Sequence, residues 1–308
     1  MEKTEIFGKI KYMINKKRTP DEMCKILGID LQSLYELILE IKKSGCSYDI
    51  VDGIPVKISP DNICSTYYIK PKNKSSICFL SDLHYGSICD RPDIIKYIYE
   101  LCNQKGIDTI ICCGDLTDGS SYKNKDNRKN QKVHSLREMV DYVANTHPYS
   151  KGITFYTISG NHDSSFLKSD GVDVIKEISL IRPDIVYLGS DRANAMFGDV
   201  SIHIYHGYGL SHNGIIENAH RYYDTLKTLP NILTLGHVHH SFYTKFDDTF
   251  VIQNAALIDQ LGVFEHAGFS CEISCFFAEL RYDENGNLQM VIPELENFGK
   301  ERIRISRN

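Results

Sequence analysis

Apolar and polar positions follow different patterns on the two sides of residue 70. In residues 1–70, apolar side chains recur three and four positions apart, as at Ile6 and Ile10, which predicts an amphipathic helix over 5–17. From Ile77 onward, short apolar runs alternate with longer amphipathic stretches. That alternation is typical of an α/β domain whose strands are separated by helices. The pattern therefore predicts a small N-terminal unit followed by a larger α/β unit.

Two further helices and a hairpin are predicted in the N-terminal unit. Thr19 can cap a helix over 20–27, and Asp30 can cap a third helix that reaches Ser44. Asp52-Gly53 separates two short β-prone runs, which is a strong hairpin signal. A short helix, a turn, a longer helix and a hairpin together resemble a winged helix. We therefore expect a winged-helix-like domain at 1–70.

Length and composition limit the class of protein. With 308 residues, 42% of them hydrophobic and 24% charged, the chain is an ordinary globular protein of more than one domain. We expect the domains to be 1–70 and 77–308, joined by a polar linker at 71–76. No apolar run is long enough to cross a bilayer and the N-terminus has no signal-peptide core, so we expect a cytoplasmic protein. The net charge of -5 argues against a protein that coats nucleic acid.

The ten cysteines are predicted to be free thiols. They form no Cys-x-x-Cys pair, and Cys78, Cys112 and Cys113 lie inside apolar runs. Buried thiols in a reducing compartment fit this pattern better than a disulfide framework or a thiolate metal site.

Polar residues of the metal-binding kind follow five predicted strands. Ligands gather at the carboxyl ends of strands in open α/β sheets, so these five strand ends can meet. Oxygens of Asp and Asn and nitrogens of His suit divalent metals. Two ions that share one bridging carboxylate would use all seven candidates, four for each ion. The candidate ligands are Asp82, His84, Asp115, Asn161, His206, His237 and His239.

The five strand ends read Asp-x-His, Gly-Asp-x-x-Asp, Gly-Asn-His-Asp, His-Gly and Gly-His-x-His, over roughly Ile77 to His239. These motifs, in this order, resemble those of the calcineurin-like metallophosphoesterase superfamily. The resemblance implies a four-layer α-β-β-α sandwich, with two β-sheets packed between helices. It implies His162 as general acid or transition-state donor and Asp118 as the residue that orients it. It also implies two metal sites, which are Asp82, His84, Asp115 and His239 for the first, and Asp115, Asn161, His206 and His237 for the second.

Such a centre predicts hydrolysis of a phosphoester. Two cations about 3.5–4 Å apart can hold a hydroxide that attacks phosphorus in line, while the metals neutralise the developing charge. We therefore expect two divalent ions. Because the candidate ligands include no thiolate, Mn²⁺ is the favoured metal, and iron, zinc or nickel stay open.

The substrate is less closely specified. Gly119 stands where protein Ser/Thr phosphatases carry Arg, which counts against a phosphoprotein substrate. The motifs SDLHYGS, GDLTDG and GHVHH look most like those of the small (exonuclease) subunit of archaeal family-D DNA polymerases and related nucleases. The winged-helix-like unit and a basic loop at 123–132 also favour a nuclease, whereas the nearly balanced charge of residues 1–70 does not. Candidate substrate contacts are Tyr85, His212, Lys123, Lys125 and Arg128.

Two alternatives stay open. One is a small-molecule phosphomonoesterase or cyclic-nucleotide phosphodiesterase, in which the N-terminal unit caps the cleft or binds a protein partner or a second copy. The other is a non-catalytic subunit that binds nucleic acid. Because every ligand position is filled, the second alternative is the weaker one.

Overall fold

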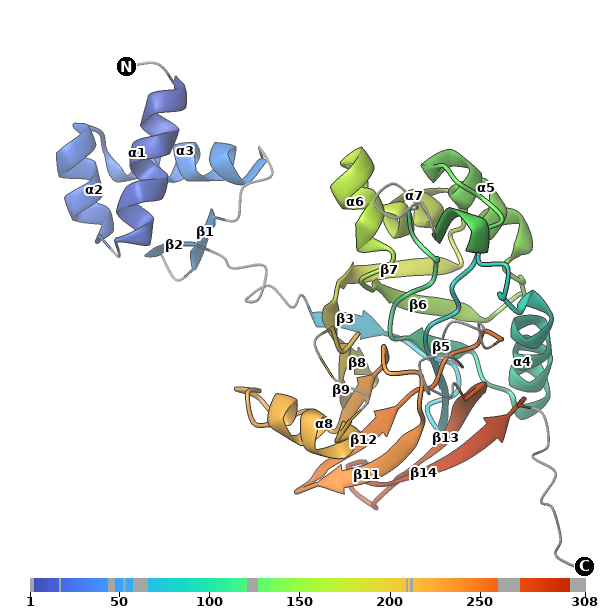
Figure 1. The fold of residues 1–308 in the computed structure, drawn as a ribbon. Helices are drawn as coiled ribbons and strands as arrows, with labels where there is room; N and C mark the ends of the chain where they lie inside the picture. The colour runs from blue at the N-terminus through green and yellow to red at the C-terminus, as the bar shows by residue number, and fades with distance from the viewer. Residues whose placement is uncertain are drawn as a thin grey trace, which may run out of the picture. The chain divides into compact units, whose positions relative to one another are not determined.

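The chain divides into two compact units, Met1–Cys64 and Ser65–Asn308 (Figure 1). The computed structural model describes residues 3–16, 18–43, 48–51, 54–57, 66–120, 127–208, 210, 213–259 and 272–299.

The N-terminal unit contains three helices and a two-stranded antiparallel hairpin. Its elements are α1 (Lys3–Asn15), α2 (Pro20–Leu27), α3 (Leu31–Lys43), β1 (Tyr48–Val51) and β2 (Ile54–Lys57). The predicted Thr19 cap of α2 is confirmed, because the side chain of Thr19 accepts from Glu22 N, and the Glu22 side chain completes a capping box by accepting from Thr19 N. This order of elements agrees with the sequence pattern, and the assignment as a winged helix stays a prediction.

A small hydrophobic core holds the three helices together. Ile10 of α1, Met23 of α2 and Leu34 and Ile38 of α3 are fully buried in one cluster. These residues recur at helical spacing, so each helix turns one apolar stripe toward the other two.

The boundary between the units differs from the expected one. Residues 66–69 form β3 (Thr66–Ile69), which pairs in parallel with β8 (Arg192–Phe197) of the second unit. We expected these residues to end the N-terminal domain. Because the partner strand lies more than a hundred positions away in the sequence, no local pattern could assign β3 to its sheet.

The second unit contains two six-stranded mixed sheets and helices, consistent with a metallophosphoesterase sandwich. The first sheet has the order β11-β12-β10-β9-β8-β3, with β9 (Val200–Tyr205), β10 (Ile232–Leu235), β11 (Phe242–Phe246) and β12 (Thr249–Gln253). The second has the order β14-β13-β4-β5-β6-β7, with β4 (Ser76–Leu80), β5 (Thr109–Cys112), β6 (Thr154–Ser159), β7 (Ile185–Ser190), β13 (Ser274–Tyr282) and β14 (Leu288–Asn297). The helical segments are α4 (Pro92–Lys105), η3 (Asn127–Asn130), α5 (Leu136–Thr146), α6 (Ser164–Asp170), α7 (Val174–Ile181) and α8 (Ile215–Tyr223).

Helices cover the outer faces of the sheets. Residues of α4, α5 and α7 share one buried cluster with strand residues such as Cys78 and Phe155 of the second sheet. On the first sheet, Ala219 of α8 packs in a cluster with Leu233 and Val251. Every residue of the central strands β5 and β10 is buried, so these strands are covered on both faces. This layering leaves the strand ends as the places where polar side chains can gather.

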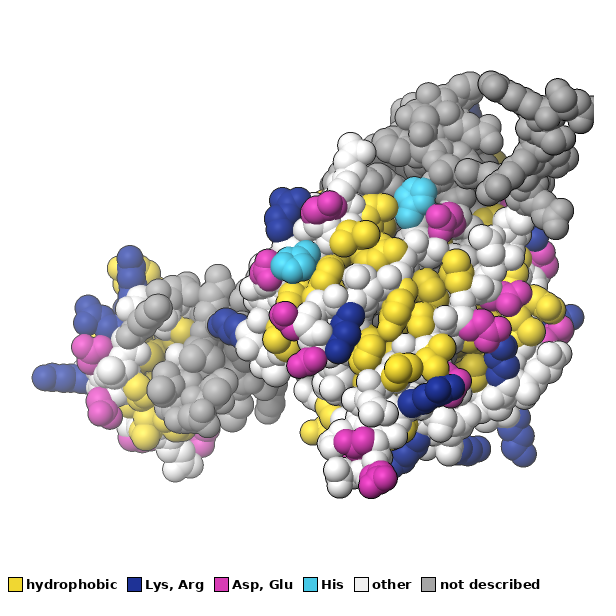
Figure 2. Space-filling model, turned by 90° about the horizontal axis from the view of Figure 1, so that it is seen from below, with side chains coloured by type: hydrophobic (Ala, Val, Ile, Leu, Met, Phe, Trp, Pro, Cys, Tyr) yellow, Lys and Arg dark blue, Asp and Glu magenta, His cyan; other side chains and the backbone are white. Residues whose placement is uncertain are grey.

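The surface chemistry of the second unit is mixed. On the face seen in Figure 2, its Lys and Arg side chains are scattered among acidic and hydrophobic ones. In the part of the chain that the structure describes, no helix is long and apolar enough to cross a membrane. The seven cysteines that the structure describes are free, as predicted.

Candidate metal centre

The candidate ligands lie just beyond the carboxyl ends of five strands. Asp82 and His84 follow β4, Asp115 follows β5, and the remaining candidates follow β6, β9 and β10. Main-chain hydrogen bonds tie the first two segments together, since Asp82 N donates to Gly114 O at 3.0 Å and His84 N to Asp115 O at 3.0 Å. Because β4, β5 and β6 are parallel, their carboxyl ends open at the same edge of the sheet.

The first group of side chains consists of Asp82, His84 and His239, all buried. Asp82 Oδ1 is 3.7 Å from His84 Nε2 and 3.3 Å from His239 Nε2. The two Nε2 atoms are 3.4 Å apart. One carboxylate oxygen and two imidazole nitrogens therefore face a common point.

The second group consists of Asp115, His206 and His237, and Asn161 joins it. His206 Nε2 is 3.3 Å from Asp115 Oδ2 and 2.8 Å from Asn161 Oδ1. The rings of His206 and His237 lie with their centroids 5.1 Å apart. His206 Nδ1 donates to Cys113 O at 2.8 Å, which leaves Nε2 as the nitrogen with a free lone pair for a metal.

Asp115 lies between the two groups. Its Oδ2 is 3.9 Å from His84 Nε2 in the first group and 3.3 Å from His206 Nε2 in the second. Its Oδ1 accepts from His162 N at 2.8 Å, just as Asp82 Oδ2 accepts from His237 N at 2.9 Å. Each carboxylate thus has one oxygen fixed by the main chain and another turned toward the histidines.

The donor set fits divalent metal ions. Asp82 Oδ1 is buried and has no hydrogen-bond partner among the described residues, which is costly unless a cation is bound there. Burial lowers the pKa of His84, but the carboxylates of Asp118 and Asp82 outweigh it and hold that pKa well above its usual value. Burial acts likewise on His206, and the charge of Asp115 raises its pKa to about 9. The site therefore has an excess of negative charge that a cation would satisfy.

Backbone strain is concentrated at these residues. Among the described residues, seven that are not glycine have φ in the left-handed region, and five of the seven are candidate ligands. L-residues adopt this region at a cost, and such outliers cluster at functional sites. The five are Asp82 (φ 56°), His84 (φ 45°), Asp115 (φ 50°), His237 (φ 73°) and His239 (φ 54°).

Two glycines allow the ligand segments to approach one another. A Cβ atom on Gly160 would lie 2.1 Å from Asp115 Oδ1, and one on Gly236 would lie 2.2 Å from Ser81 Oγ and 3.0 Å from Asp82 Oδ2. Neither glycine is among those with positive φ. At both positions glycine is needed for space rather than for conformational freedom.

His162 and Asp118 lie beside the first group. The His162 ring packs edge-on against His84 with centroids 4.6 Å apart, and its side chain is 37% exposed. We expected Asp118 to hydrogen-bond and orient His162, and in the structure the bond is made by the main chain of Asp118. His162 Nδ1 bonds the main-chain carbonyl of Asp118 at 3.0 Å, while the carboxylate Oδ1 is 3.7 Å from that nitrogen and 3.3 Å from His84 Nδ1.

Gln131 is a buried residue beside the candidate centre whose contacts the sequence did not reveal. It is 6% exposed, and its Nε2 donates to Asp118 O at 3.2 Å, Asp118 Oδ2 at 3.1 Å and Gly119 O at 3.0 Å. Gln131 also forms a β-bridge with Ser87. A glutamine inside a polar loop gives no signal of this kind, because its partners are brought to it only by the fold.

The candidate substrate contacts have mixed outcomes. Tyr85 is 1% exposed and its hydroxyl is 3.2 Å from His147 Nδ1, so its side chain is part of the core and does not reach a substrate. His212, Lys123 and Lys125 lie outside the described residues. Arg128 lies in η3, and its side chain is not described.

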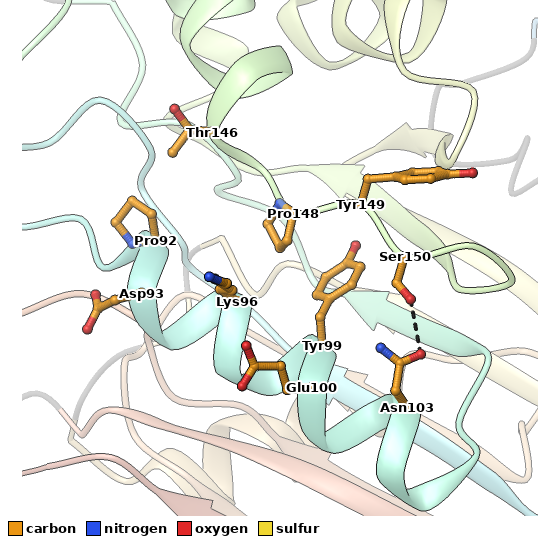
Figure 3. A pocket seen from close by; sticks show the side chains of 10 residues that line it. All are labelled: Pro92, Asp93, Lys96, Tyr99, Glu100, Asn103, Thr146, Pro148, Tyr149 and Ser150. Carbon is orange, nitrogen blue, oxygen red and sulfur yellow. Dashed lines mark hydrogen bonds between the residues drawn. The ribbon is translucent and has the colours of Figure 1, made fainter.

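A cavity of about 520 Å³ lies apart from the candidate ligands, between α4 and the residues that follow α5 (Figure 3). Tyr99 lines it, and its hydroxyl is 2.8 Å from His147 Nε2. His147 is buried between Tyr99 and Tyr85. Tyr85 follows His84 directly, so a buried hydrogen-bonded chain separates the cavity from the metal centre.

Comparisons with known proteins agree with this geometry. The model of the calcineurin-like phosphoesterase superfamily domain matches residues 76–256. Two uncharacterized metallophosphoesterases of Helicobacter pylori, from strains 26695 and J99, are 33% and 32% identical over 97 residues. That stretch is 32% of this chain and spans only 22% of the length of either relative.

The chain is also similar to solved structures at low sequence identity. A novel archaeal phosphodiesterase is 19% identical with a TM-score of 0.40, covering 71% of this chain and 99% of its own. A putative 5′-nucleotidase from Staphylococcus aureus is 15% identical with a TM-score of 0.43, covering 72% of this chain and 54% of its own. None of these similarities singles out the archaeal polymerase subunit, so that finer resemblance stays a prediction.

Proposed function

The chain belongs to the calcineurin-like phosphoesterase superfamily, and we propose that it is a phosphodiesterase that uses two divalent metal ions. The observation that carries the proposal is the position of Asp115 Oδ2, within 4 Å of a histidine nitrogen from each group of candidate ligands. A carboxylate oxygen between two nitrogen-rich groups suits an ion on either side of it. One such group alone would suggest a single structural ion.

The proposed ligands divide as the two groups do. Asp82, His84 and His239 would hold the first ion, and Asn161, His206 and His237 the second, with Asp115 shared. When bound, the ions would activate water and neutralise charge on the phosphoryl group. Oxygen and nitrogen donors without a thiolate favour Mn²⁺ or iron over a purely structural zinc.

His162 is the proposed proton donor to the leaving group. A carbonyl oxygen can only accept, so the bond to Asp118 O requires a proton on His162 Nδ1. That bond fixes the ring, and Nε2 remains as the atom that gives a proton to the leaving oxygen. Exposure of 37% leaves the ring accessible to a substrate.

We propose a nucleic acid as the substrate. The proposal is supported by the motif likeness to nucleases and by the way the basic loop begins and ends. One end of that loop is Gly119, and the other, Gln131, is bonded to Gly119 O and to Asp118. Ile88 N also donates to Asn130 O at 2.8 Å. The described segments on either side of the basic residues thus lie beside Asp118, and the positive charge at 123–129 favours a nucleic-acid substrate.

Manganese-dependent hydrolysis tests the proposal. Single-stranded DNA, duplex DNA, RNA, bis-p-nitrophenyl phosphate and p-nitrophenyl phosphate are compared in parallel. We expect cleavage of polymers and of the diester, lost in Asp115→Ala and in His162→Ala. The matched control is His220→Ala, since His220 is a half-exposed helical histidine that takes no part in either group.

Three results would overturn parts of the proposal. Hydrolysis of the monoester alone would indicate a small-molecule phosphatase. Cleavage that persists in Asp115→Ala would point to a contaminating enzyme. Binding of DNA without any hydrolysis would indicate a non-catalytic subunit.

A further inference from the structure

Tyr208 is an exposed aromatic residue beside the proposed second metal site. Its side chain is 65% exposed. Its ring centroid lies 6.1 Å from that of His237, with 60° between the ring planes. Because the ring contributes little to the core, its exposed face can be covered by a bound group.

The main chain that carries Tyr208 is held firmly in place. Tyr205 Oη donates to Tyr208 O at 2.8 Å, and the Tyr205 ring stacks on Tyr222 with centroids 3.9 Å apart and 12° between planes. Gly207, with φ of 93°, brings the turn so close to the next ligand segment that a Cβ there would lie 3.0 Å from Gly236 O. The main chain at Tyr208 is thus fixed by a hydrogen bond from the stacked Tyr205 side chain and by the close approach of Gly207 to Gly236.

We propose that Tyr208 is a stacking platform for a nucleobase of the substrate, which makes it a specificity-determining residue. The inference rests on the proposed function, because it takes the phosphate to bind at His237 and its neighbours. In a nucleotide, one sugar separates the base from the phosphate. The ring of Tyr208 is a direct neighbour of the ring of His237, so a base can stack on Tyr208 while its phosphate lies near His237. Aromatic side chains bind bases of any sequence through their faces, so the platform selects nucleotides without selecting a base.

The absence of tryptophan from the sequence permits a direct test. Tyr208→Trp introduces a single fluorescent reporter that keeps an aromatic face at the site. The matched control is Tyr149→Trp, since Tyr149 is 69% exposed and lines the separate cavity beside α4 (Figure 3). Both variants are loaded with Mn²⁺ and titrated with 5′-AMP, 3′-AMP and inorganic phosphate.

We expect at least one nucleotide to quench Tyr208→Trp saturably, with no saturable effect of phosphate and no quenching of Tyr149→Trp. Calorimetry on the manganese-loaded protein gives the affinity. Tyr208→Ala should weaken the binding of that nucleotide about tenfold, whereas Tyr208→Phe should stay within about twofold of the original protein. The affinity for inorganic phosphate should not change.

The two proposals fail in different ways. If the protein hydrolyses phosphodiesters but neither nucleotide quenches Tyr208→Trp, the platform is refuted and the proposed function stands. Equal losses of nucleotide and phosphate affinity in Tyr208→Ala would also refute it, since they indicate damage to the metal centre. If nucleotides bind and quench but no phosphodiester is cleaved, the proposed function is refuted instead.

Discussion

Substituting alanine for Gly160 should separate the geometry of the metal centre from the stability of the fold. The new Cβ would lie 2.1 Å from Asp115 Oδ1, and ordinary contact begins at 3.4 Å, so the two must move apart by about 1.3 Å. Metal–ligand distances tolerate changes of only about 0.2 Å. The carboxylate cannot move away freely, because Asp115 is 1% exposed and its Oδ1 accepts from His162 N.

Two measurable losses follow from that displacement. Overpacking of this kind costs about 1–3 kcal/mol of unfolding free energy. A ligand misplaced by about 1 Å should lower kcat/KM about 100-fold, or about 2.7 kcal/mol in transition-state stabilisation. Urea unfolding of the metal-free protein and diester hydrolysis measure these two losses, and calorimetry measures the manganese affinity beside them.

Gly8→Ala is the control, because Gly8 lies within α1 and a Cβ there meets nothing within 4 Å. It should leave metal binding unchanged and stabilise the N-terminal unit by about 0.5–1 kcal/mol, the usual gain in a helix. If Gly160→Ala bound manganese and turned over substrate like the original protein, the packing of Gly160 against Asp115 would not define the site.

Further predictions concern single groups around the centre. His162→Ala should keep manganese affinity but lower kcat by about 10²–10⁴, measured by diester hydrolysis and calorimetry; a loss of metal binding would make His162 a ligand. Gln131→Leu should lower unfolding free energy by about 2 kcal/mol in urea and reduce activity through Asp118; an unchanged protein would show that its three hydrogen bonds are dispensable. Burial lowers the pKa of His147 to about 3, and the charge of Arg182 adds to this, whereas the unfolded residue titrates near pH 6.5. The resulting stability is complete above about pH 6.5 and is lost as the pH falls toward 3, so unfolding at pH 7 and pH 5 should differ less in His147→Gln. Chelation of the metal by EDTA should lower the melting temperature. If the free metal concentration was 100 times its Kd before chelation, the loss of unfolding free energy is about 2.7 kcal/mol. An unchanged melting temperature would mean that no metal was bound.

That the seven candidate ligands would lie near one another could be predicted, because each follows a short apolar run that is recognisably a strand. Parallel strands bring their carboxyl ends to the same edge of a sheet, whatever the conformation of the loops. The local hydrophobic pattern and this one topological rule were therefore enough to predict which residues gather there. The strand assignments that failed were those set by distant partners. β3 can be assigned to its sheet only when its partner β8 is known. β8 itself was not predicted, because Arg192–Phe197 has no β-branched residue.

The supporting residues could not be predicted, because their roles depend on contacts between distant segments. Gln131 meets Asp118 only after the loop between them has closed, and Tyr85 turns its hydroxyl toward His147 rather than toward the site. The atom of Asp118 that bonds His162 is its main-chain carbonyl oxygen, which no sequence pattern distinguishes from the carboxylate. Side-chain type predicted which residues gather here, and only the fold determines which atoms they use.

The left-handed backbone at five candidate ligands implies a trade-off between thermostability and activity. Each such residue costs about 1 kcal/mol relative to glycine, which adopts this region freely. In the metal-free protein, a search for variants that survive higher temperature would therefore be drawn to these positions, and each success would remove a candidate ligand. Selection for heat resistance without metal should convert this chain step by step into an inactive scaffold, so directed evolution must be carried out with metal present or must screen for metal binding at every round.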